Sequence, residues 1–281
     1  YITMLIDEMA NHHIRAFQNT VLAYYNAHPR YNLPWREIEE NHSIDPYKVM
    51  VSELMLQQTQ VSRVIPKFTE FILQFPTVEA LAKAQLSAVL TAWSGLGYYR
   101  RAKFLHHAAM TICADLGGTI PNKVSDLVTL PGIGVNTAGA IVAYSFNRPV
   151  VFIETNIRTV YIHHFFADQK IVSDKELSLL VKQCLCGMDP RTWYWALMDY
   201  GAYLKTTQKD AHKKSTSYKK QSAFEGSKRQ VRGRILKILA QKPCTYEQLS
   251  QFINDTRLSL ILGDLRHESL ISFHEDVYYI G

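Results

Sequence analysis

The sequence predicts an all-α protein that ends in a small unit of helices and a hairpin. Apolar residues recur at three- and four-residue intervals along most of the chain, as they do on the buried face of a helix. The alternating pattern of a strand is nearly absent before residue 270. Of the 281 residues, 47% are hydrophobic and 20% are charged, which is typical of a globular protein with a substantial core.

Helices are predicted along the whole chain. The first covers residues 12–25. A longer one covers 47–75, and Pro66 should kink or divide it because proline removes an internal hydrogen bond. The other helices of this part are predicted at 78–83, 86–93, 101–116, 124–129, 136–146, 156–166, 174–186 and 191–204.

The C-terminal residues have a pattern of their own. Helices are predicted at 231–240, 245–253 and 256–269, followed by a hairpin of 270–273 and 277–280. Three helices and a hairpin in about fifty residues are typical of a winged helix. The third helix is only mildly basic, so groove reading and contact with a protein both stay open.

Charge and cysteine content narrow the function classes. Lys and Arg exceed Asp and Glu by 31 − 25 = 6, which weakly favours a polyanionic partner. No stretch approaches the ~18–20 apolar residues of a membrane span. The four cysteines form neither a disulfide framework nor metal-ligand spacing. Six lysines in the polar stretch 205–220 indicate either a solvated linker or a contact with a DNA backbone.

The first motif with chemical content is Leu130-Pro-Gly-Ile-Gly-Val-Asn-Thr-Ala138. One helix ends at Leu130 and another begins near Asn136, with two glycines in the turn between them. Glycines permit positive φ and close backbone approach, so the N–H groups of the turn can face a phosphate. PGIG alone also fits a simple helix corner. With TAGAI after it, the pattern is typical of a helix-hairpin-helix that grips the DNA backbone without reading sequence.

Two further motifs carry polar residues beside apolar ones. Glu53 lies in the apolar helix 51–61, where a partly desolvated carboxyl would have the raised pKa of a general acid; an exposed glutamate is the alternative. Gln57, Gln58 and Thr59 follow and suit hydrogen bonds to base edges.

The segment Trp93-Ser-Gly-Leu-Gly-Tyr-Tyr-Arg-Arg-Ala-Lys103 combines glycines, tyrosines and cations. It indicates a turn that offers rings to bases and cations to phosphates, through Tyr98, Tyr99, Arg100 and Arg101. The alternative is aromatic packing beside a tight turn.

These motifs, together with Leu33-Pro-Trp-Arg36, resemble the adenine DNA glycosylases of the MutY family, within the helix-hairpin-helix DNA glycosylase superfamily. The resemblance runs from Leu33 to Leu204, in order and with similar spacing apart from a longer stretch after Arg36. It implies a two-lobed helical core. One lobe would be a six-helix unit at 48–147, and the other would combine 1–47 with 148–224. A winged-helix-like domain would follow at 225–281.

The resemblance implies a monofunctional enzyme of base excision repair. Such enzymes flip a nucleotide out of the duplex and hydrolyse its N-glycosidic bond, here at adenine mispaired with 8-oxoguanine or guanine. The base must be protonated, and a carboxylate can stabilise the oxocarbenium-like sugar. By position, Glu53 matches the general acid, Arg36 an active-site arginine and Tyr98 an aromatic wedge. We expect DNA contacts from Gln57, Gln58, Thr59, Tyr98, Tyr99, Arg100, Arg101, Gly132, Ile133, Gly134, Val135, Asn136 and Thr137.

Two catalytic positions depart from the family. Where the family has an Asp before a helix, this chain reads Ile153-Glu-Thr-Asn156; Glu154 keeps the charge but moves it by roughly 1.5 Å and should cap the helix less well. Glu154 is then either a relocated stabiliser or a sign of another substrate base. Asn136 replaces the lysine of related glycosylase–lyases, so we expect no Schiff base and no strand cleavage.

Two larger features of the family are also missing. The four cysteines of its iron–sulfur cluster would fall near Lys205, His212, Ser215 and Gln221, so we predict no cluster. A monovalent or divalent cation at the helix-hairpin-helix stays open. The oxidised-guanine-sensing domain doesn't fit in the last ~55 residues, which resemble a winged helix instead, and this leaves the 8-oxoguanine preference open.

Three functions are therefore carried forward. The first is an adenine glycosylase, and the second is a glycosylase for another base, such as uracil or thymine opposite guanine. The third is a non-catalytic DNA damage-binding protein on the same scaffold. In each, the expected partner is double-stranded DNA with a damaged or mispaired base. We expect a monomer in the cytoplasm, associated with the nucleoid and not with a membrane.

Overall fold

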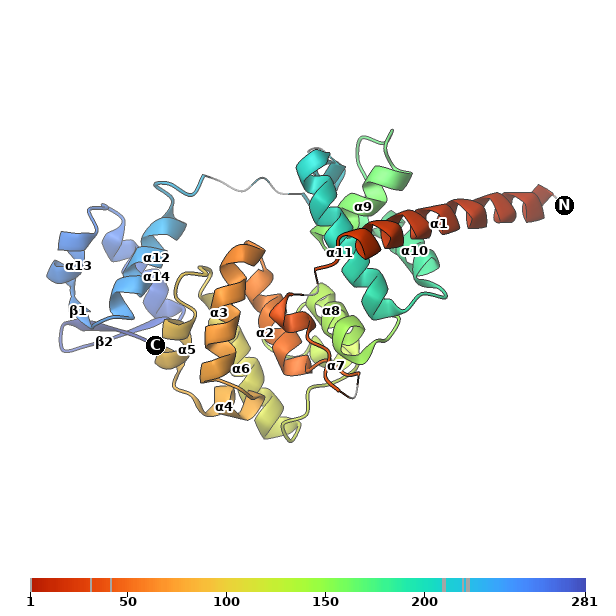
Figure 1. Cartoon of the computed structure of the whole chain (residues 1–281). Helices are drawn as coiled ribbons and strands as arrows, with labels where there is room; N and C mark the ends of the chain where they lie inside the picture. The colour runs from red at the N-terminus through yellow and green to blue at the C-terminus, as the bar shows by residue number, and fades with distance from the viewer. Residues whose placement is uncertain (1, 31, 41, 209–210, 219, 221–222) are drawn as a thin grey trace. The chain divides into compact units, whose positions relative to one another are not determined.

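The computed structural model confirms a mostly helical chain (Figure 1). Its contacts divide into two compact units, described separately below. Unit 1 comprises residues 1–46, 122–124 and 134–220, and unit 2 comprises 47–121, 125–133 and 221–281. For 2–11 and 211–212 only the backbone is described. The residues outside the description are Tyr1, Tyr31, Asn41, Lys209, Asp210, Lys219, Gln221 and Ser222.

Unit 1 is built around one long helix, α11, which packs against α9, α1 and α8. Its Trp193 and Tyr194 are fully buried. At Gly201 a Cβ would fall against the Asn156 carbonyl oxygen, closer than atoms can lie, so glycine lets α9 approach α11. The elements are α1 (Ile2–Ala27), η1 (Pro34–Arg36), α8 (Val135–Phe146), α9 (Thr155–Phe165), α10 (Asp174–Leu185), α11 (Pro190–Thr207) and η2 (Ala211–Lys214).

Unit 2 combines a helical layer with the C-terminal residues. Helix α6 packs against α4 and α5, and strand β3 also reaches α5. The helices are α2 (Pro46–Leu56), α3 (Val61–Gln74), α4 (Val78–Lys83), α5 (Leu86–Ala92), α6 (Arg100–Asp115), α7 (Val124–Leu127), α12 (Lys228–Leu239), α13 (Tyr246–Phe252) and α14 (Leu258–His267). The strands are β1 (Cys244–Thr245), β2 (Ile271–His274) and β3 (Val277–Ile280).

The prediction of one helix over 47–75, kinked or divided at Pro66, is wrong about the position of the break. Pro66 lies inside α3, and the chain breaks earlier, between α2 and α3, where Gln58 has a positive φ of 56°. Carbonyl oxygens at the end of α2 accept hydrogen bonds from Arg101, a residue of α6. A side chain from a distant segment thus ends the helix, which periodicity cannot reveal.

The helices and the hairpin predicted for the C-terminal residues are confirmed. Strands β2 and β3 pair antiparallel, with Ile271 opposite Ile280, and β1 adds to the other side of β3 in the order β1-β3-β2. The two-residue β1 was not predicted because it is too short to show an alternating pattern. Thr245 caps α13 in a capping box with Gln248. The winged-helix assignment stays a prediction.

Across the described part of the chain, no helix combines the length and the apolar character needed to cross a membrane.

Candidate functional site

Glu53, the predicted general acid, lies in the second half of α2 in unit 2. Its side chain is half-buried, and its neighbours Ser52, Leu54 and Met55 are almost completely buried. Glu53 therefore lies at the edge of an apolar helix face. Its catalytic role stays a prediction.

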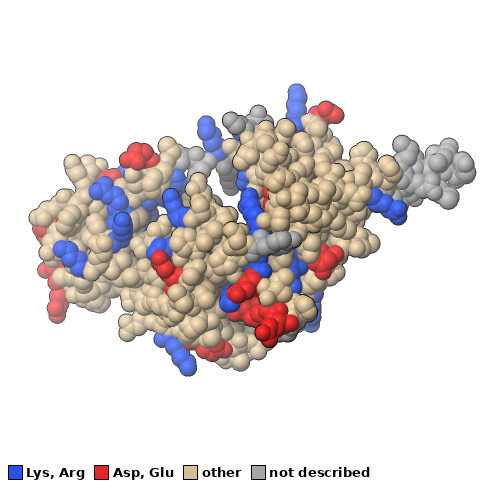
Figure 2. Space-filling model, viewed as in Figure 1, with Lys and Arg blue, Asp and Glu red and all other residues tan. Residues whose placement is uncertain are grey.

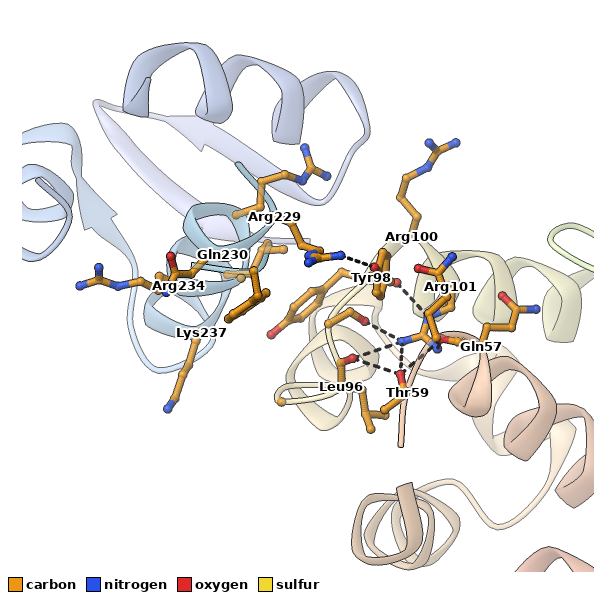
Figure 3. Close-up of a pocket in the computed structure, with 18 of the residues that line it drawn as sticks. Gln57, Thr59, Leu96, Tyr98, Arg100, Arg101, Arg229, Gln230, Arg234 and Lys237 are labelled. Carbon is orange, nitrogen blue, oxygen red and sulfur yellow. Dashed lines mark hydrogen bonds between the residues drawn. The ribbon is translucent and has the colours of Figure 1, made fainter. Parts of the chain in front are cut away.

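Arg101 is the organising side chain of this region (Figure 3). It is buried, and its Nη1 donates to the carbonyl oxygens of Leu54, Met55 and Gln57 at 2.7, 2.8 and 2.6 Å. Its Nη2 donates to the Gly97 carbonyl oxygen at 3.0 Å. Burial lowers the pKa of Arg101 to about 10, which keeps it charged at neutral pH. Arg101 thus joins the end of α2 to the turn before α6; the predicted DNA contact stays a prediction.

The turn before α6 presents one tyrosine and buries the next. Gly95 and Gly97 have φ of 99° and 71°, and Tyr98 has a φ of 49°, a strained value for a residue with a side chain. Tyr98 is half-exposed. Tyr99 is only 5% exposed, and its hydroxyl donates to Ser94 Oγ at 3.3 Å. Of the two predicted DNA-contacting tyrosines, Tyr98 is the accessible one.

An open groove of about 1210 Å³ lies within unit 2 beside this turn. One wall is formed by residues 57–60 and 95–101, and the other by α12. Helix α12 was not predicted to be part of the site; the signal that could have found it is its run of five cations without an acid. The cationic side chains lining the groove are Arg63, Arg100, Arg101, Lys228, Arg229, Arg232, Arg234 and Lys237.

The helix-hairpin-helix turn has the backbone that its glycines predict. Gly132 has a φ of 77°, and a Cβ there would lie 2.5 Å from the Phe104 Cβ, so only glycine fits. Ile133 is buried, whereas Gly134 and Val135, which begin α8, are exposed. The first N–H groups of α8 are therefore accessible to an anion. Phosphate and cation binding here stay predictions, as do the assigned contacts of Asn136, which is exposed, and Thr137, which is half-buried.

Glu154, the predicted second carboxylate of the site, lies in unit 1. It is the N-cap of α9, and its Oε1 accepts from the N–H groups of Asn156 at 2.5 Å and Ile157 at 3.1 Å. Burial raises the pKa of Glu154, while these hydrogen bonds and the charges of Lys205 and Arg158 counteract the rise. The longer side chain still places its carboxylate at the N-terminus of a helix.

Asn136 contacts the segment that leads into Glu154. Its Oδ1 accepts a hydrogen bond from the Ile153 N–H at 3.1 Å. Beyond Glu154, the Asn156 Oδ1 accepts from Lys205 Nζ at 3.2 Å. The contact between Asn156 and Lys205 beside Glu154 was not predicted, because it joins segments 49 positions apart and no local pattern shows it.

Arg36, the predicted active-site arginine, is buried in unit 1. Its Nη1 and Nη2 donate to the two carboxylate oxygens of Asp199 at 2.8 and 2.9 Å, and its guanidinium lies 5.2 Å from the Trp195 ring. This bidentate pair anchors η1 to α11. The observed task is structural, and the catalytic role stays a prediction.

The resemblance places the cluster cysteines near Lys205, His212, Ser215 and Gln221, and the absence of an iron–sulfur cluster stays a prediction. Lys205 and Ser215 carry no thiol, while Gln221 and the side chain of His212 lie outside the description. Within the described residues, no group of His, Cys, Asp or Glu is arranged to hold a metal. Backbone hydrogen bonds join this segment to Val172 instead: Val172 N donates to Lys214 O at 2.9 Å, and Thr216 N donates to Val172 O at 3.0 Å.

Side chains add to this attachment. Ser217 Oγ donates to Asp174 Oδ2 at 3.0 Å, and Arg158 donates to both carboxylate oxygens of Asp174 at 2.8 Å. These contacts lower the pKa of Asp174, the Arg158 hydrogen bonds most strongly. The predicted lysine-rich linker is therefore attached to unit 1 at residues 214–217, while its Lys209 and Lys219 lie outside the description.

Comparison with known proteins places the chain in a family. Residues 51–184 match the HhH-GPD superfamily of base excision DNA repair proteins. The adenine DNA glycosylase of Mycolicibacterium smegmatis is 34% identical over 248 residues, covering 82% of this chain and 83% of that protein. That of Mycobacterium tuberculosis is 32% identical over 269 residues, covering 84% and 83%. The Buchnera aphidicola adenine DNA glycosylase is 36% identical over 192 residues, and the match spans 52% of it, about half its length.

Solved structures show the same fold. A thermostable thymine-DNA glycosylase has a TM-score of 0.61 and 24% identity, covering 69% of this chain and 88% of that one. An endonuclease III–DNA covalent intermediate has a TM-score of 0.53 and 16% identity, covering 68% and 85%. The fold of the matched part of the chain is that of the helix-hairpin-helix glycosylase superfamily. Within that superfamily, the chain belongs to the adenine DNA glycosylase family.

Proposed function

We propose that this protein is a monofunctional DNA glycosylase that removes adenine from a mispair in duplex DNA. The observation that carries the proposal is the Glu154 carboxylate held at the N-terminus of α9 by two backbone N–H groups. A carboxylate fixed in this way can stabilise positive charge that develops on a deoxyribose. Glu53, half-buried on an apolar helix, supplies the acid.

The proposed reaction is a hydrolysis. Glu53 gives its proton to a ring nitrogen of the flipped adenine, the bond between the base and C1′ breaks, and its electron pair leaves with the base. The negative charge of the Glu154 carboxylate stabilises the oxocarbenium-like sugar. Water adds to C1′, and the proton that it loses restores Glu53 through the solvent. The products are free adenine and an abasic site.

Asn136 supports the monofunctional assignment. Its amide has no amine that could form a Schiff base, and its Oδ1 is hydrogen-bonded to the Ile153 N–H. We therefore propose that Asn136 positions the segment before Glu154, and that strand cleavage needs added alkali.

We further propose guanine or 8-oxoguanine as the opposite base. Gln58, Thr59 and Tyr98 support this because they line one groove in unit 2. The second candidate, excision of another base such as uracil or thymine opposite guanine, is favoured by one observation, the replacement of the family's Asp by Glu154. We also propose that the protein acts as a monomer, that it is associated with the nucleoid, and that it carries no iron–sulfur cluster.

The test is single-turnover base release from labelled duplexes containing A:8-oxoG, A:G, T:G, U:G or hypoxanthine:T, each followed by alkali. We expect cleavage at adenine for the wild type and a loss of at least about 100-fold in rate for Glu53→Gln and for Glu154→Gln. Asp189→Asn, a change at another N-cap in unit 1, is the matched control and should keep the rate. Cleavage only at another base would keep the glycosylase activity but assign it a different substrate base. Binding without release from any duplex would leave a non-catalytic damage-binding protein.

A further inference from the structure

The C-terminal residues add a cationic helix to the groove that contains Tyr98. We propose that α12, the first helix of these residues, binds the phosphate backbone of the duplex beside the opened base pair. The inference rests on the proposed function and states which surface of unit 2 holds the DNA. It also makes Arg229 a positioning residue for Tyr98.

The charge of α12 carries the first step. Its sequence KRQVRGRILKIL contains five cations and no acid, and all five line the groove. Val231, Ile235 and Leu239 on its other side are buried in the core. Figure 2 shows Lys and Arg side chains on the surface of this end of unit 2, with Asp and Glu side chains along its edge. A cationic face next to an apolar one is what a helix needs to rest on a domain and contact phosphates.

Two of the five cations are neutralised from within unit 2. Lys228 pairs with Asp264, and Arg232 pairs with Glu268 at 2.6 Å. Arg234 donates to the Phe252 carbonyl oxygen, which carries no net charge. Among the described residues, no ion pair involves Arg234, Lys237, or the Arg63 and Arg100 side chains of the facing wall. The groove therefore keeps a net positive charge.

Helix α14 is the alternative surface, since the third helix of a winged helix is the usual DNA reader. Asp264 of α14 forms an ion pair with Lys228 of α12. Glu268, one residue past the end of α14, forms an ion pair with Arg232 of α12. Leu258, Ile261 and Leu265 of α14 are buried. Helix α14 thus supports α12 and presents less unneutralised positive charge, so we place the proposed phosphate contact on α12 and not on α14.

Arg229 connects α12 to the predicted wedge. Its Nη1 donates to the Tyr98 hydroxyl at 2.8 Å, and its guanidinium lies 5.9 Å from the Tyr98 ring and 5.4 Å from the Phe224 ring. Arg101 lies 5.4 Å from the same tyrosine ring. In Figure 3, Arg229 reaches towards Tyr98, whereas Arg234 and Lys237 project in the opposite direction. One helix thus both orients Tyr98 and offers cations to a strand beside it.

Gly233 lies in the middle of α12 and lines the groove. Glycine is unfavourable inside a helix, and here nothing lies within 4 Å of the position of a Cβ. The open space at Gly233 leaves room for a sugar–phosphate backbone to approach the helix. A side chain at this position would project into that space.

The test is duplex affinity as a function of salt for Arg234→Gln/Lys237→Gln, measured by fluorescence anisotropy with an undamaged duplex and with A:8-oxoG. Lys242→Gln/Arg266→Gln is the matched control, because it removes the same charge from C-terminal residues that do not line the groove. We expect the slope of log affinity against log salt to fall by about 2, with a loss of roughly ten-fold or more in affinity at low salt. The control should match the wild type, and both variants should keep the wild-type Tm.

Gly233→Glu provides an independent reading. It adds a negative charge to the groove at a site with open space and replaces glycine by a better helix former, so we expect weaker binding at a Tm no lower than that of the wild type. Equal affinity and salt slope for the groove and control variants would overturn the proposal and leave α12 as a surface for a protein. Because the undamaged duplex needs no base release, this failure is distinguishable from a failure of the glycosylase function.

The positioning role of Arg229 has its own readout. Fluorescence of a 2-aminopurine placed next to the mispair reports unstacking by the wedge. We expect Arg229→Gln and Tyr98→Phe each to reduce this fluorescence. The double variant should reduce it no further than the more severe single variant, since both substitutions remove the same hydrogen bond. Additive losses would overturn the coupling.

Discussion

At the scale of single residues, hydrogen bonds to the backbone fix the positions of the side chains at the predicted site. Glu154 accepts hydrogen bonds from two backbone N–H groups, and Asn136 accepts one from a third. Arg101 donates hydrogen bonds to several backbone carbonyl oxygens. Each group is thereby fixed before DNA arrives, which lowers the cost of ordering it in the complex. Glu154 shows that a longer carboxylate can take the N-cap position that the sequence pattern reserves for Asp.

His164 permits a pH prediction in unit 1. Burial, and secondarily the charge of His163, lower its pKa to about 4, below the usual 6.5. The unfolded chain then binds more protons than the folded one between pH 4 and pH 6.5, so His164 costs stability as the pH falls through this window. Since the ring is partly solvated, we expect about 1–2 kcal/mol.

His164→Phe tests this, because a phenyl ring can keep the packing against Phe17 at 5.1 Å. Urea unfolding at pH 7 and at pH 4.5 should show a smaller loss of stability in the variant than in the wild type. An identical loss in both proteins would contradict the prediction. The variant also loses the contact between His164 Nε2 and the Tyr200 hydroxyl at 3.1 Å, which is why the two pH values are compared within each protein.

At the scale of elements, close approaches decide where the functional groups lie. Helix α2 ends where Arg101 of α6 donates hydrogen bonds to the last carbonyl oxygens of α2. Helix α9 begins where it packs closely against Gly201 of α11. Both contacts join segments far apart in the sequence. The motifs themselves were recognisable in the sequence, but the residues that place them were not.

Gly201→Ala should displace the N-terminus of α9 and Glu154 with it. The new methyl group would meet the backbone of Asn156, and we expect a loss of about 1–3 kcal/mol in the free energy of unfolding. Gly263→Ala in α14 is the matched control, since nothing lies near its Cβ position; it should gain up to about 1 kcal/mol. Urea unfolding measures both, and a gain for Gly201→Ala would contradict the predicted approach.

At the scale of the whole chain, hydrogen bonds attach the segment after α11 to the rest of unit 1. Asp174 accepts from Arg158 and from Ser217, and residues 214–216 exchange backbone hydrogen bonds with Val172. In unit 2, the C-terminal residues complete a cationic groove beside Tyr98.

The clusterless proposal predicts that the purified protein carries no stoichiometric iron or acid-labile sulfide. Chelator treatment should leave its Tm and its rate of base release unchanged, because no thiolate ligands lie at the cluster positions. Mutant proteins are not needed: iron analysis and thermal unfolding with and without chelator suffice. Iron near four atoms per chain, with a Tm that falls on chelation, would contradict the proposal.

The helical class, the order of the motifs and the family can be predicted from the sequence, because short contiguous patterns such as PGIG and SELMLQQT carry their own backbone and chemical constraints. The glycines of the tight turns can be located in the same way. In contrast, the break after α2 depends on Arg101, and the position of α12 beside Tyr98 depends on packing between distant segments. Arg229 and Tyr98 are 131 positions apart, and no local pattern can show which distant surfaces meet when apolar faces are buried.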